Sequence, residues 1–280
     1  MNELILGRIR TIGVAALASF AVAAVGSVVW SALLVVNART SRSVPWSVPV
    51  MAVVLAAYWW WLSGHGWPAQ TAEARSRLLR ARRVTRAAFS WSIVGGAFAL
   101  VALAGLWIIL VQLTGNGGNP TQAQLDGYPG LFVGLAILMG SLVSPLTEEA
   151  AFRGYGQVIL ERHFVPIYAM GISSLFFTLW HGPTQGFFWS KLLFFFLVGI
   201  TFGTIAYLTD STLPAIPVHI AGDLLFFIFI WPQDAHRILL SQHGPDLWFW
   251  INAAQVVVFS GLAIVAFRRL ALLRPSRASL

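Results

Sequence analysis

Three groups of residues that can carry out chemistry lie inside segments that are otherwise hydrophobic. They are Glu148-Glu149-x-x-x-Arg153, Phe177-x-x-x-His181 and His219-x-x-x-Asp223. A charged side chain at membrane depth costs roughly 2.5 kcal/mol or more, so ionisable residues in three separate hydrophobic segments require an explanation. The simplest explanation is that these side chains face one another and form a reactive site.

The residue types in these groups indicate hydrolysis by an activated water molecule. Two histidines and a carboxylate with an open position suit a zinc-bound water, and a glutamate with a histidine suits general-base catalysis without a metal. The chain has no cysteine, which excludes a cysteine nucleophile and thiolate metal sites. His-Glu-x-x-His is absent as well, which excludes the zinc-binding helix of the site-2-protease type.

Helical spacing separates the two neighbouring glutamates. Glu149 and Arg153 are four residues apart with the acid first, so they are expected to pair on one helix face. Glu148 lies about 100° around the helix from Glu149 and needs a different partner. Pro145 is expected to kink this helix and to open space for water.

The two histidines have different local settings. His181 stands directly before Gly182-Pro183, which predicts a helix break and a pocket at that point. His219 and Asp223 are four residues apart on one helix face. The carboxylate could therefore orient the imidazole, or both groups could address one ligand.

The elements that position these groups are hydrophobic helices. The chain is 58% hydrophobic and 10% charged, with a mean hydropathy of +0.75, and its uncharged runs are long enough to cross about 30 Å of bilayer core. The composition predicts an all-α polytopic membrane protein with the active site inside the helix bundle. About eight transmembrane helices are expected, near 11–36, 46–63, 88–113, 130–160, 165–181, 187–209, 213–231 and 247–267.

Most of the basic residues fall on one side of this arrangement. With the N-terminus inside, that side receives the arginines near residue 10, those of the segment 64–86 and those of the C-terminal tail. The positive-inside rule then predicts a multi-pass protein of the cell membrane with both termini cytoplasmic. The net charge of +8 comes from basic residues next to the ends of the predicted helices, where they meet anionic lipid headgroups. No nucleic-acid partner is therefore expected. The segment 64–86 is interpreted as a basic amphipathic helix that anchors the chain on the inner surface. The sequence shows no obvious repeat and no low-complexity tract. It therefore predicts a single integral membrane domain over 1–280.

The three motifs, in this order and each on its own predicted helix, resemble those of the CPBP family of intramembrane proteases. This family is also called Abi and includes the type II CAAX prenyl endopeptidases. The resemblance covers about residues 130–230, and the other helices share only hydropathy.

The resemblance implies roles for the motif residues. Glu148 would be the catalytic base that activates water, with His181 as its partner. His219 and Asp223 would complete the site as metal ligands or as groups that stabilise the oxyanion. The family has asparagine or aspartate at the position of Asp223. A neutral asparagine could stabilise an oxyanion, whereas an ionised aspartate acts as a ligand or orients His219, which favours a metal.

Three further residues, Glu149, Arg153 and Phe177, would support the site. In a metal-dependent enzyme one divalent cation, zinc in the first instance, would be held by Glu148, His181, His219 and Asp223. In a metal-free enzyme no cofactor is expected. The substrate would be a membrane-associated peptide or protein, such as a prenylated CAAX-type chain, and the lipid bilayer is the other expected partner.

Other classes of function remain open. A catalytically silent membrane scaffold or immunity protein would use the Glu149–Arg153 pair for structure alone. A proton-coupled transporter would be favoured by inverted repeats, and none is found. A rhomboid-like serine protease built on Ser173 and His219 would leave Glu148 unexplained.

Overall fold

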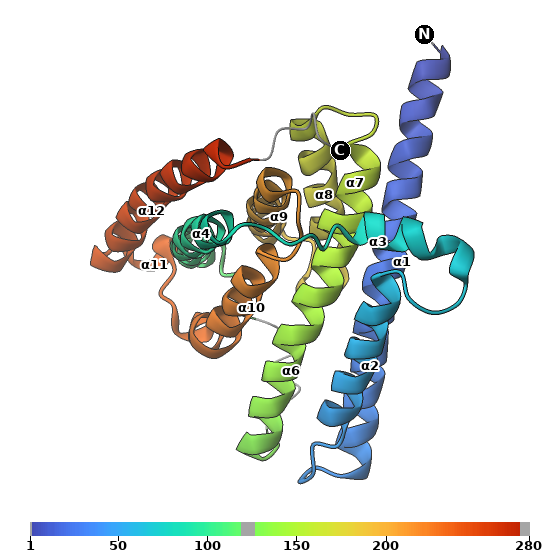
Figure 1. Cartoon of the computed structure of the whole chain (residues 1–280). Coiled ribbons are helices and arrows are strands. Elements are labelled where there is room, and N and C mark those ends of the chain that lie inside the picture. The colour runs from blue at the N-terminus through green and yellow to red at the C-terminus, as the bar shows by residue number, and fades with distance from the viewer. Residues whose placement is uncertain (1, 119–126, 275–280) are drawn as a thin grey trace. The chain divides into compact units, whose positions relative to one another are not determined.

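The computed structural model describes residues 2–118 and 127–274, and within these ranges all regular structure is helical (Figure 1). A helix occupies each of the eight predicted segments, so the all-α polytopic fold class is confirmed. These helices are α1 (Asn2–Thr40), α2 (Ser47–Leu62), α4 (Arg86–Thr114), α6 (Gly130–Glu148) with its continuation, α8 (Pro166–Gln185), α9 (Trp189–Thr209), α10 (Ala215–Leu225) with its continuation, and α12 (Leu247–Leu272).

The number of helices able to cross a membrane is six in the described ranges, rather than eight. The two that fall short are α2, which has only 16 residues, and α8. In α8 the last turns contain His181, Gly182, Pro183, Thr184 and Gln185, which lower its hydrophobicity although it has 20 residues. The length and polar content of these two helices are the physical reason for the difference.

Contacts between residues divide the chain into two compact units. The first comprises Met1–Ala81 and Thr121–Phe176, and the second comprises Arg82–Pro120 and Phe177–Leu280. Helix α8 begins in the first unit and ends in the second. The single membrane domain expected from the sequence stays a prediction.

The first unit is built on α1, α2 and α6. The turn between α1 and α2 is held by Asn37, which is fully buried. Its side-chain amide donates to the carbonyls of Ser41 and Val44, and its carbonyl oxygen accepts from the backbone N–H of Ser47, each at 2.8 Å. These bonds satisfy backbone groups at the turn and at the start of α2, where no helical partner exists.

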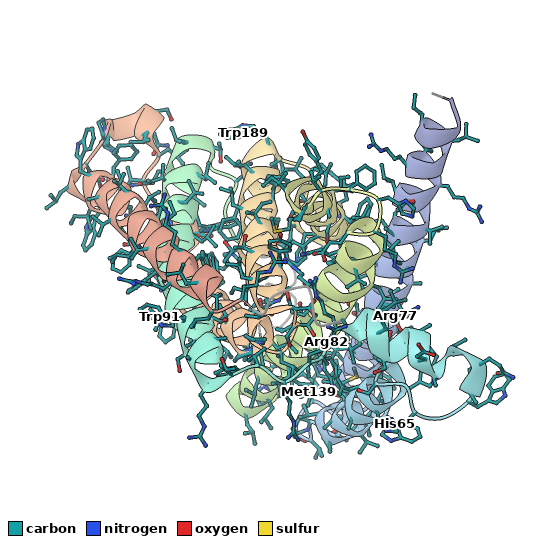
Figure 2. All side chains as sticks on the ribbon, turned by 45° about the horizontal axis from the view of Figure 1, so that its top comes forward. His65, Arg77, Arg82, Trp91, Met139 and Trp189 are labelled. Carbon is teal, nitrogen blue, oxygen red and sulfur yellow. The ribbon has the colours of Figure 1, made fainter. Side chains whose placement is uncertain are left out.

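The core of the first unit lies between these three helices. Met51 and Leu55 of α2 pack against Met139 and Val143 of α6, and Figure 2 labels Met139. Helix α1 lies close to α6 at Gly26, where a Cβ atom would lie 2.2 Å from Thr147 Cγ2. A small residue is needed there, as is common where membrane helices pack closely.

The segment 64–86 differs from the basic amphipathic helix expected from the sequence, because its helical part is short. It consists of the short 3₁₀-helix η1 (Ala69–Thr71) and the eight-residue helix α3 (Ala72–Leu79). Arg75 and Arg80 are buried, whereas Arg77, labelled in Figure 2, is exposed. The helix ends early because Arg80 adopts a left-handed conformation with φ 56°.

The second unit contains α4, α9, α10 and α12, and Figure 1 shows α12 beside α4. Helix α10 packs on α4 at Gly96, where a Cβ atom would lie 2.5 Å from Val218 Cγ1. The π-helix η3 (Phe226–Ile230) continues α10, followed by η4 (Trp231–His236) and the short α11 (Leu240–His243). The close approach at Gly96 holds α10 against α4 at Val218, the residue directly before His219.

A buried carboxylate ties together one end of the second unit. Asp234 accepts hydrogen bonds from Trp107 Nε1 at 2.8 Å, from the backbone N–H of Gly118 at 2.7 Å and from Arg237 Nε at 2.7 Å. Lys191 Nζ donates to the carbonyl of Gly118 at 3.2 Å. A buried charge needs such partners, so this network links α4, α9 and η4.

Candidate active site

The first motif straddles a change in helix type. Glu148 is the last residue of α6, and the next eight residues form the π-helix η2 (Glu149–Gly156), followed by the short helix α7 (Gln157–Leu160). The segment predicted as one helix over 130–160 is therefore three consecutive helical pieces. All eight residues of η2 are buried. π-helical turns are rare and occur often at functional sites.

The two glutamates take different partners, as their spacing predicts. Glu149 Oε1 lies 3.1 Å from Arg153 Nη1, and the side chains are 0% and 1% exposed. Glu148 is 4% exposed, and its Oε1 accepts a hydrogen bond from Ser144 Oγ at 2.8 Å. The ion pair neutralises one carboxylate, and the Ser144 bond fixes the orientation of the other.

Neighbouring elements of the first unit hold η2 in place. Ser173 Oγ of α8 donates to the carbonyl of Phe152 at 2.6 Å. Phe20 of α1 contacts the ring of Phe152 edge-on, with ring centroids 6.3 Å apart. This bond gives Ser173 a structural role on η2, whereas a serine protease would use the same hydroxyl as its nucleophile.

The second motif lies near the end of α8, in the second unit. His181 Nδ1 lies 2.9 Å from the carbonyl oxygen of Phe177. Because a carbonyl only accepts, Nδ1 carries a proton in this contact. The predicted helix break at Gly182-Pro183 is wrong, since α8 continues to Gln185. Pro183 removes one backbone donor there without ending the helix.

The third motif lies on α10 of the same unit. His219 is 4% exposed, and its Nε2 lies 3.6 Å from Asp223 Oδ1. The two groups therefore face each other as their spacing predicts, but the distance exceeds that of a hydrogen bond. At this distance the carboxylate acts on the imidazole through charge.

Two phenylalanines of α9 complete the surroundings of the histidines, and neither was predicted from the sequence. Phe195 stacks on His181 with ring centroids 4.1 Å apart and an angle of 18°. Phe202 stacks on His219 at 4.4 Å and 25°. Phe177 contacts both histidine rings, at 4.5 Å and 6.0 Å. The seven-residue spacing of Phe195 and Phe202 puts them on one face of α9, but this helix contains four phenylalanines and spacing alone does not single out these two.

The predicted metal-ligand set is divided between the units. Glu148 belongs to the first, and His181, His219 and Asp223 belong to the second. Within neither unit do the described residues include a group of three or more His, Asp or Glu side chains that could hold a metal ion. The residues grouped within either unit therefore do not by themselves match a zinc site with three protein ligands.

The helices and their hydrophobic composition define a multi-pass membrane protein. Residues 130–225, which extend from the start of α6 to the end of α10, match the family model described as type II CAAX prenyl endopeptidase Rce1-like. The match shows that this segment is similar to the CPBP/CAAX protease family, and it confirms the resemblance predicted from the three motifs. It supports a peptidase in general terms. No curated protein and no solved structure matches the chain.

Proposed function

We propose that this protein is an intramembrane endopeptidase that hydrolyses a peptide bond of a membrane-associated substrate. The observation that carries the proposal is the family match over 130–225, because it contains all three motifs. The packing within each motif agrees with it, since every ionisable motif residue has an oriented contact on its own helix.

In the proposed reaction Glu148 is the general base. Its carboxylate removes a proton from water, and the resulting hydroxide attacks the scissile carbonyl carbon to form a tetrahedral oxyanion. The same proton then passes from Glu148 to the leaving amine as the C–N bond breaks. Ser144 keeps the carboxylate oriented for both transfers.

The second and third motifs supply the electrostatic part of the proposal. His181, His219 and Asp223 stabilise the oxyanion or, in a metal-dependent enzyme, bind the cation that polarises the carbonyl. The aromatic rings of Phe177, Phe195 and Phe202 fix the imidazoles, so that their nitrogens need little reorganisation during the reaction. Glu149 and Arg153 hold the backbone next to Glu148.

The first experiment is cleavage of short membrane-anchored and prenylated CAAX-type peptides by the purified protein in detergent. Wild type is compared with Glu148→Ala and His181→Ala, each with and without a chelator. Glu73→Gln is the matched control, because Glu73 is an exposed glutamate of the same chain. Activity lost in both site variants and kept in the control supports the peptidase, and chelator sensitivity then separates metal-bound from glutamate-activated water. Equal behaviour of all four proteins would instead favour the membrane scaffold.

We also propose that the protein resides in the cell membrane with both termini cytoplasmic. The support is the excess of arginine on one side of the predicted helices. Because the chain has no cysteine, single cysteines at Ser76 and at Trp250 can be tested for labelling by a membrane-impermeant thiol reagent in intact cells. Labelling at position 250 without labelling at position 76 is expected, and the reverse result would invert the topology.

A further inference from the structure

The short helix α3 packs directly on the helix that carries the first motif. A Cβ atom on Gly154 of η2 would lie 2.8 Å from the carbonyl oxygen of Leu78 and 3.1 Å from that of Leu79. These are backbone atoms, which cannot rotate away as a flexible side chain can. The end of α3 and the middle of η2 are therefore in close contact.

Arg80, the residue that ends α3, reaches the far end of the same helical run. Its guanidinium donates to both carboxylate oxygens of Glu161, at 3.2 Å and 3.1 Å. Arg80 is 3% exposed, and the Glu161 side chain is 12% exposed. Bidentate pairs of this kind are strong and fix the relative orientation of both groups.

Glu161 is itself attached to the run that contains the first motif. It directly follows α7, and Gln157 Nε2 donates to its Oε1 at 2.9 Å. The run η2–α7 starts immediately after Glu148 and ends immediately before Glu161. A displacement of the chain at Glu161 is thus transmitted along a buried helix to Glu148.

The other end of α3 is also held. Arg75 is buried and donates to the carbonyls of Trp61, His65 and Pro68 at 2.8, 2.8 and 3.0 Å. Its guanidinium lies 4.5 Å from the centre of the Trp61 ring. These bonds hold α3 at the end of α2 and so restrict the position of Arg80, the residue that ends α3.

We propose that Arg80 and Glu161 are positioning residues for Glu148. This inference rests on the proposed peptidase function, and it gives the segment 64–86 a task besides membrane anchoring. The ion pair holds α7 against α3 and so sets the height and rotation of η2. Two arginines of the same segment differ in this respect, since Arg80 is buried against Glu161 while Arg77 pairs with Glu73 on the surface.

The expected consequence of breaking the pair is a misplaced base rather than a weaker substrate site. A shift of about 1 Å in a catalytic group lowers rates by up to about a hundredfold. Arg80→Gln and Glu161→Gln are each expected to lower kcat about tenfold or more with KM nearly unchanged. Arg77→Gln, the matched control, removes an exposed arginine from the same helix and is expected to leave kcat unchanged.

The test combines these variants with a charge exchange. The double variant Arg80→Glu with Glu161→Arg should recover kcat by roughly fivefold over either single reversal, because the two groups are coupled. Unchanged kcat in Arg80→Gln, an equal loss in Arg77→Gln, or a loss confined to KM would each overturn the inference. If Arg80→Gln, Arg80→Lys and Glu161→Gln all fail to fold, the pair serves folding alone and the positioning role is rejected.

A second readout needs no activity and keeps this inference separate from the proposed function. Spin labels on Ser76→Cys and His163→Cys, both exposed and in the first unit, report the distance between α3 and the end of α7. A narrow distance distribution in the parent that broadens in Arg80→Gln supports the proposed hold, and an unchanged distribution overturns it. If the parent cleaves no peptide, the proposed function fails while this measurement still decides whether the pair holds α7.

Discussion

Arg153 Nη1 lies 3.1 Å from Glu149 Oε1, and this ion pair is almost completely buried at the start of a π-helix. The pair directly follows Glu148 in the chain, so the positive charge of Arg153 compensates the negative charge of Glu149 next to the Glu148 carboxyl group. A buried charge without its partner is far less stable than the pair. The pair therefore gives the motif a structural requirement that is separate from its chemistry.

Replacing Arg153 by methionine is expected to destabilise the protein strongly. The uncompensated Glu149 carboxylate would cost about 3–5 kcal/mol. Thermal unfolding in detergent measures the loss. Arg77→Met is the control, because breaking its exposed pair with Glu73 should cost at most about 1 kcal/mol. Similar stability of the two variants would mean that the buried pair contributes no more to the free energy of unfolding than the exposed one.

Replacing Glu148 by glutamine is expected to separate chemistry from stability. The amide keeps an acceptor for Ser144 but has no basicity, so cleavage should fall by about a hundredfold or more. The melting temperature should stay near that of wild type. Ser144→Ala, which removes only the orienting bond, should show a much smaller loss in kcat. Retained activity in Glu148→Gln would remove this residue from the catalytic role.

Replacing Phe195 or Phe202 by leucine is expected to loosen one histidine at a time. Stacked aromatic pairs contribute about 0.5–1.5 kcal/mol, which corresponds to roughly a two- to twelvefold fall in activity. The proton signals of His181 should move in Phe195→Leu and those of His219 in Phe202→Leu, because the ring current is lost. Phe229→Leu is the control, since Phe229 is 65% exposed. Unshifted histidine signals would show that the stacking is absent in solution.

Replacing Gly154 by alanine is expected to push α3 away from η2. The added methyl group meets the carbonyl oxygens of Leu78 and Leu79, so a loss of about 1–3 kcal/mol is expected. Gly171→Ala in α8 is the control, because nothing lies within 4 Å of a Cβ atom there. Alanine favours a helix over glycine, so this control should be neutral or slightly stabilising. Chemical unfolding of both variants measures the difference, and equal stabilities would argue against the close contact.

Sequence alone placed a helix at each of the eight observed positions and predicted the Glu149–Arg153 pair. Hydrophobicity and four-residue spacing are local properties, and they act in the same way wherever the helix lies. The family resemblance over about 130–230 rests on the same kind of local information, and the match over 130–225 agrees with it.

Local signals misled the prediction where neighbouring elements decide the outcome. Gly182-Pro183 predicts a break, yet α8 continues to Gln185, and Pro183 removes only one backbone donor there. The arginines of 64–86 look alike in sequence, yet Arg75 and Arg80 are buried while Arg77 is exposed.

The sequence by itself determined the class of protein, the helices and the residues able to do chemistry. Only the tertiary structure decided that Phe195 and Phe202 stack on the histidines and that Arg80 binds Glu161. Arg80 and Glu161 are far apart in the chain, and the phenylalanines lie on a different helix from either histidine. Such contacts depend on how helices pack, and hydrophobic periodicity gives the face that packs without naming its partner.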